Sequence, residues 1–154
     1  MPSRHRSRQR ALQILFQWDS RRRASDTGIP TETAIAAYYD TLYSEESERR
    51  PERDDFVDQL VTGVVERIDA IDELITRHAE HWKIARMPAV DRNVIRLAVY
   101  EMLALPTPRA VVIDEALELA RKFSEEEAVQ FVNGVLDAVR RELEKADLGM
   151  ADPG

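Results

Sequence analysis

The spacing of the apolar residues constrains this chain more than any other feature, because it repeats every three or four residues along most of the sequence. In the segment AVQFVNGVLDAV, residues 128–139, the repeat is carried by Ala128, Val132, Val135, Leu136 and Val139. Such spacing describes one stripe along an α-helix, whereas a half-buried strand would alternate. The Asn-Gly dipeptide in this segment is normally a hairpin signal, but here it is predicted to lie within a helix.

Similar stripes predict helices along the rest of the chain. The expected helices span residues 8–22, 31–43, 54–67, 69–75, 89–105 and 109–123, and a capping box at 124–127 opens a last one. Pro106 and Pro108 end the fifth helix, and the charged segment 44–53 is predicted to be a surface loop. Few glycines are present for the tight turns of an all-β protein. The predicted fold class is therefore all-α.

The composition and motifs exclude several classes of site. The chain has no cysteine, which rules out disulfides, thiolate metal sites and cysteine nucleophiles. His78 and His81 lie one helical turn apart, but their surroundings fit neither H-E-x-x-H nor Glu-x-x-His, so we expect two partly exposed histidines on a helix. The sequence also lacks a Gly-rich phosphate loop and a nucleophile elbow. We therefore expect a binding protein rather than an enzyme, without a metal or cofactor.

The expected compartment is the cytoplasm. No apolar run approaches the roughly 18 residues that span a membrane. The N-terminus is charged and lacks the apolar core of a signal peptide.

Charge is distributed unevenly along the chain. The whole sequence carries a formal charge of −7, yet residues 1–23 contain seven arginines and a single acid, Asp19. Basic N-terminal arms commonly bind nucleic acid. A solubilising terminus without a binding role explains the arginines equally well on charge alone.

Four segments carry a resemblance to a known family. They are SRQRALQILFQWD (7–19), DRNVIRLAVYEM (91–102), VVIDEALELARKF (111–123) and QFVNGVLD (130–137). In order and spacing they resemble the NusB family of transcription antitermination factors, although residues 20–53 depart more freely. The resemblance implies a compact fold of two small packed helix bundles with about seven helices. It also implies a domain over residues 1–146, with a partly disordered basic arm at 1–10 and a flexible tail at 147–154.

The resemblance further implies a function. Family members bind boxA-type single-stranded RNA in nascent ribosomal RNA leaders, usually together with the ribosomal protein NusE, and act on transcribing RNA polymerase. A related domain precedes some RNA cytosine methyltransferases, and here we expect the free-standing factor. Some relatives dimerise, so homodimerisation of this chain stays an open alternative. The alternative is a helical protein-binding adaptor or homodimer without direct RNA contact, in which the arginine arm is only a tail.

Candidate RNA-binding residues follow from the family and from helix geometry. Phe131 falls at the border of the buried stripe, where an aromatic ring can stack on a base, and the family uses its matching Phe in this way. A Phe at the edge of the core is the alternative. The predicted set is Arg4, Arg6, Arg8, Arg10, Phe16, Arg121, Lys122, Gln130, Phe131 and Asn133.

Several members of this set have a second interpretation. Phe16 stands where the family often has Tyr and would serve the core equally well. Gln130 stands where some relatives have Lys, so one phosphate contact is in doubt. Asn133 could bond to a base edge or to a neighbouring helix, while Gly134, without a Cβ, would permit close approach of a ligand or backbone.

Candidate partner-binding residues lie on the otherwise apolar helix expected at 89–105. They are Asp91, Arg92, Tyr100 and Glu101. The resemblance implies NusE contacts mainly on the C-terminal half of the chain, and polar residues at the rim of this helix could orient the partner. Simple solvation of the outer face is the alternative.

Overall fold

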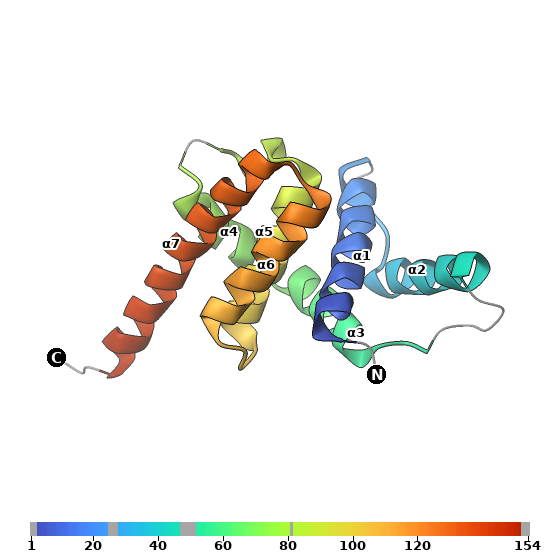
Figure 1. Cartoon of the computed structure of the whole chain (residues 1–154), viewed down its shortest axis with the longest axis horizontal. Coiled ribbons are helices and arrows are strands. Elements are labelled where there is room, and N and C mark those ends of the chain that lie inside the picture. Colours follow the sequence, from blue (N-terminus) through green and yellow to red (C-terminus); the bar gives the residue numbers. More distant parts are fainter. Residues whose placement is uncertain (1–2, 25–27, 47–51, 81, 152–154) are drawn as a thin grey trace. The chain divides into compact units, whose positions relative to one another are not determined.

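The helical prediction is confirmed by a computed structural model, which describes residues 3–24, 28–46, 52–80 and 82–151. These residues form seven α-helices and one short 3₁₀-helix, and none of them lies in a strand. The chain divides into two compact units, Met1–Glu66 (unit 1) and Arg67–Gly154 (unit 2), each drawn in its own range of colours in Figure 1. The predicted pair of small helix bundles corresponds to these units.

Unit 1 contains α1 (Arg4–Ala24), α2 (Thr31–Glu46) and α3 (Asp55–Glu66), and α1 packs against both of the others. Its core is formed by buried apolar side chains of all three helices: Ala11, Leu12, Ile14, Leu15, Trp18, Ala34, Ile35, Tyr38, Tyr39, Val57, Leu60, Val61 and Val64. Helix α1 begins four residues earlier than the apolar stripe predicts. The reason is a cap, because the backbone N–H of Arg6 donates to the hydroxyl of Ser3 at 3.1 Å.

Unit 2 contains α4 (Ile68–His78), the 3₁₀-helix η1 (Ile84–Arg86), α5 (Ala89–Ala104), α6 (Arg109–Phe123) and α7 (Glu126–Ala151). Helix α5 is central: it packs against α4, α6 and α7, and every residue from Asp91 to Met102 is buried. Helix α7 continues past residue 146, so the boundary predicted there for the tail is not a boundary of secondary structure.

The Asn-Gly dipeptide lies inside α7, as its surroundings predict. Val132, Leu136 and Val139 are completely buried, whereas Asn133 and Gly134 face outward. A Cβ placed on Gly134 would meet no atom within 4 Å. The absence of a side chain there is therefore not required by packing within the protein.

The predicted capping box is displaced. Helix α7 begins at Glu126, which places Glu125 rather than Ser124 directly before the helix. The hydroxyl of Ser124 donates to the carboxylate of Asp91 on α5. This bond fixes the turn between α6 and α7 to the central helix.

The burial pattern of α7 predicts different costs for two truncations. Leu136→Ala should lower the free energy of unfolding by about 2–5 kcal/mol, because it leaves a cavity at a fully buried position. Phe131→Ala should cost less, because its side chain is only half-buried. Urea or thermal unfolding of both variants measures the difference. Equal losses would contradict the border position of Phe131.

Candidate nucleic-acid interface

Unit 2 has a surface pocket of about 290 Å³ where the end of α4 faces α7. The residues that line it are His78, Ala79, Glu80, Trp82, Gln130, Phe131, Gly134 and Val135. The rings of Trp82 and Phe131 are in contact, with centroids 5.9 Å apart and planes tilted by 58°. The pocket therefore brings together two of the predicted RNA-binding residues, Gln130 and Phe131, with an aromatic residue that the sequence patterns did not indicate.

Trp82 is held in position by the chain reversal after α4. The backbone N–H of Trp82 donates to the carbonyl of Ala79 at 2.8 Å. Glu80, between them, has a φ of +28°, in the left-handed region that favours glycine. A side chain in this region costs about 1–2 kcal/mol, and such strain is often found near functional sites.

The segment after Trp82 is fixed from the interior. The buried guanidinium of Arg92 donates to the carbonyl of Ile84 at 3.1 Å and to that of Met87 at 2.7 Å. The loop that carries Trp82 is thus attached to α5 at its far end.

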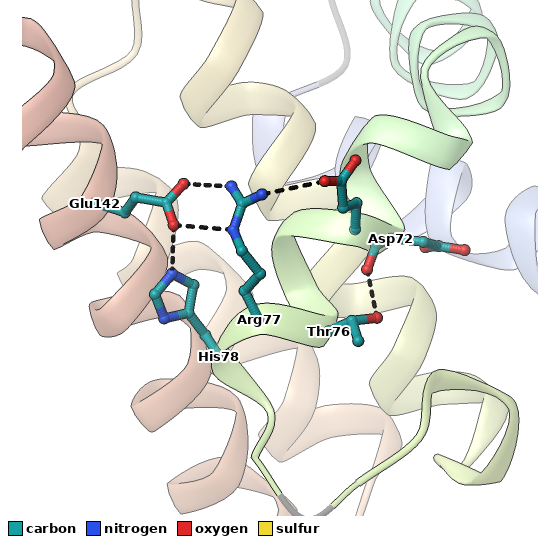
Figure 2. A network of polar contacts seen from close by, with 6 residues as sticks. Asp72, Thr76, Arg77, His78 and Glu142 are labelled. Carbon is teal, nitrogen blue, oxygen red and sulfur yellow. Dashed lines mark hydrogen bonds and ion pairs between the residues drawn. The ribbon is translucent and has the colours of Figure 1, made fainter.

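A charged network joins the end of α4 to α7 (Figure 2), and one of its members, His78, also lines the pocket. Glu142 of α7 accepts hydrogen bonds from Arg77, at 2.6 and 3.2 Å, and lies 3.0 Å from Nε2 of His78. Arg77 also contacts Glu73 at 3.3 Å. His78 is therefore in contact with the carboxylate of Glu142, and the described residues contain no group of three metal-ligating side chains. His81, its predicted neighbour, lies outside the described residues.

The predicted basic arm divides into buried and exposed arginines. The guanidinium of Arg4 lies over the ring of Phe56 at 3.9 Å, and that of Arg8 lies 5.7 Å from the same ring. Arg8 is only 5% exposed, so it belongs to the interior of unit 1 rather than to its surface. Arg4 and Arg6 are exposed and Arg10 is half-buried. Since the guanidinium of Arg4 lies against Phe56, Arg6 and Arg10 are the better placed for phosphate contacts.

The remaining predicted residues are on the surface. Phe16 is 41% exposed, so the alternative that it only serves the core does not hold. Asn133 is exposed on α7. On α6, Arg121 pairs with Glu118 at 2.9 Å, and the Nζ of Lys122 lies 5.5 Å from the ring centre of Phe123.

Comparison with known proteins gives the family. A sequence model described as the NusB family matches residues 5–141, which is most of the chain. The chain belongs to the NusB family. It is 66% identical to the transcription antitermination protein NusB of Solibacter usitatus (strain Ellin6076), over 93% of this chain and 92% of that protein.

Solved structures agree with this assignment. NusB from T. maritima superimposes with a TM-score of 0.75 at 34% identity, covering 92% of both chains. A chain from a crystal structure of antitermination factors NusB and NusE in complex with double-stranded RNA gives a TM-score of 0.72 at 26% identity. That match covers 92% of this chain and 99% of the other. The chain is thus a NusB transcription antitermination factor and not an enzyme. None of its described helices is long and apolar enough to cross a membrane.

The polar residues predicted for NusE contact are placed differently from the expectation. Asp91, Arg92, Tyr100 and Glu101 are between 1% and 6% exposed, so both their solvation and a rim position on α5 are wrong. The reason is that α5 is enclosed by α4, α6 and α7, and its polar groups are bonded internally. Asp91 accepts from Ser124, Arg92 donates to two carbonyls, and Tyr100 lies under the guanidinium of Arg67 at 6.0 Å.

The spacing of apolar residues does not predict that Trp82 lines this pocket. It lies in a short segment without a helical stripe, between α4 and η1. The one indication in the sequence is a large aromatic residue next to the charged Lys83.

The network beside the pocket predicts a pH dependence. Hydrogen bonds from Arg77 and then His78 hold the pKa of Glu142 below its usual value. A carboxylate whose pKa is lowered by folding stabilises the fold above its unfolded pKa of about 4.3, and this contribution is lost as the pH falls through the folded value. Glu142→Gln should therefore make stability less dependent on pH below about 5. Urea unfolding across this range measures the effect.

The matched control for this measurement is Glu144→Gln on the same helix. It removes a carboxylate but leaves Arg77 and His78 with their partner. If Glu142→Gln kept the acid dependence of the parent, the network would contribute nothing to folding.

Proposed function

We propose that the chain binds boxA-type single-stranded RNA in nascent ribosomal RNA leaders together with NusE, and that it acts on transcribing RNA polymerase in the cytoplasm. The observation that carries this proposal is the position of Phe131. Its ring lines an open pocket together with the amide of Gln130, instead of being enclosed in the core. An aromatic face beside an amide suits an unpaired base, which stacks on the ring and bonds through its edge.

Charge supports the same proposal. The chain is acidic overall, so phosphates require local cations. In unit 1, Arg4 and Arg6 are exposed and Arg10 is half-buried near the start of α1, and exposed Phe16 lies further along the same helix. In unit 2, Arg121 and Lys122 are exposed near the end of α6, and Asn133 offers an amide on α7. The guanidinium groups of Arg4 and the buried Arg8 lie over the ring of Phe56, and we propose that this cluster supports the surface that carries these groups.

NusE is the proposed protein partner, since a solved relative is in complex with NusE and RNA. Because Asp91, Arg92, Tyr100 and Glu101 are buried, we assign them a positioning role beneath the partner surface. Leu103 and Val111, at the adjoining ends of α5 and α6, are exposed apolar side chains suited to direct contact.

A gel-shift assay with boxA-type RNA, with and without NusE, tests the function. We expect a shifted complex that is stronger with NusE and weaker with a scrambled sequence. Absence of RNA binding in both conditions, with NusE still bound, would instead favour the protein-binding adaptor. A homodimer that binds neither RNA nor NusE would sediment with the mass of two chains.

Arg6 and Arg10 predict a change in the salt dependence of RNA binding. Each phosphate contact on a single strand contributes about −0.7 to the slope of log K against log salt. Replacing Arg6 and Arg10 together by Ala should therefore flatten the slope by up to about 1.4 and weaken binding to specific and scrambled RNA alike. Phe131→Ala is the control, because stacking releases no counterions and the slope should stay unchanged.

The measurement is RNA affinity as a function of salt, in the presence of NusE, for the parent, the double arginine variant and Phe131→Ala. An unchanged slope for the double variant would place the phosphate contacts elsewhere, with Arg121 and Lys122 the next to be replaced.

A further inference from the structure

Trp82 is unusually exposed for its size. Its side chain is 52% accessible, whereas the only other tryptophan, Trp18, is 6% accessible in the core of unit 1. Leaving a large aromatic surface in water forfeits the free energy of burying it. The fold does not need this ring for its core, which points to a ligand that covers it.

The geometry points to a base-stacking role, and we propose that Trp82 and Phe131 form a two-ring platform that binds two unpaired RNA bases. This inference rests on the proposed RNA binding at Phe131. A centroid distance of 5.9 Å is that of aromatic rings in direct contact, so no base fits between them. Each ring instead stacks one base on its accessible surface, and the tilt of 58° turns the second base relative to the first.

The rest of the pocket suits bases and phosphates. Gly134 leaves open space on the α7 side, where a side chain would otherwise stand. The amide of Gln130 can donate to and accept from a base edge. Lys83 and Arg86 follow Trp82 in the chain and are both exposed, which places cations beside the backbone of a bound strand.

The backbone on either side of Trp82 is held by contacts within the protein. The strained backbone at Glu80 and the hydrogen bond from Trp82 to Ala79 define one end of the loop, and Arg92 holds the other end through Ile84 and Met87. A preorganised ring loses less conformational entropy on binding than a mobile one. Strained backbone positions cluster at ligand-binding sites, and the position of Glu80 near Trp82 agrees with this.

Substitution of Trp82 measures its contribution. Trp82→Ala should weaken binding of a boxA-type single-stranded RNA by about 5- to 150-fold, which is the range for loss of one stacked base. Trp82→Phe keeps an aromatic face and should retain most of the affinity. Neither variant should change the salt slope, and both should unfold at close to the parent temperature, because the side chain lies outside the core.

Fluorescence gives a direct readout of stacking. Adding the RNA should quench the emission of the parent as a base covers the exposed indole. The quench should disappear in Trp82→Phe, whose one remaining tryptophan is the buried Trp18. The same RNA with an abasic site in place of the stacked base should bind the parent and Trp82→Ala equally well.

The outcomes distinguish a failure of the two-ring platform from a failure of RNA binding itself. If the parent binds RNA but Trp82→Ala binds as tightly and the parent shows no quench, the platform is wrong and RNA binding stands. If Trp82→Ala weakens binding of NusE without RNA and leaves RNA affinity unchanged, Trp82 contacts the protein partner and the inference is overturned. If the parent binds no RNA even with NusE, the proposed function fails, and the platform fails with it.

Discussion

The hydrogen bonds made by the buried polar side chains of α5 are the constraint on which the rest of unit 2 depends. Arg96 forms a two-pronged ion pair with Asp72 of α4, both contacts at 2.8 Å, and Arg92 holds the loop before α5 through two carbonyls. Asp91 receives the hydroxyl of Ser124 at the turn between α6 and α7. One helix thereby fixes three neighbouring segments, and removal of Asp72 would destabilise unit 2 by taking away the ion pair of the buried Arg96 guanidinium.

The interior of unit 2 therefore positions the helices, and its surface carries the side chains suited to RNA. The apolar stripes of α4, α6 and α7 pack onto α5, while the side chains suited to RNA remain outside. Phe131 on α7 and Trp82 before η1 come from different segments, and each of these segments is tied to α5. A polar interior is costly in general, but here it specifies the positions of the elements that carry the pocket.

The sequence predicts the helices well, because three- and four-residue spacing reports directly which face of a helix is buried. It also places Phe131 at the border of that face. It does not predict that Asp91, Arg92, Tyr100 and Glu101 are interior, because their burial depends on partners such as Ser124 that are distant in the chain. The same limit applies to Arg8. The alternating arginines of the N-terminal segment suggest that it lies on the surface, whereas it is buried in unit 1 beside Phe56.

We propose that this acidic helical protein binds RNA through a few exposed cations and aromatic rings on each of its two units. Photo-crosslinking of thiouridine-substituted boxA-type RNA to the protein with NusE, followed by peptide mapping, tests it most directly. The expected crosslinks lie in residues 4–16 of unit 1, and in 82–86 and 121–134 of unit 2. Crosslinks confined to α2 or to the C-terminal half of α7, or to NusE alone, would contradict it.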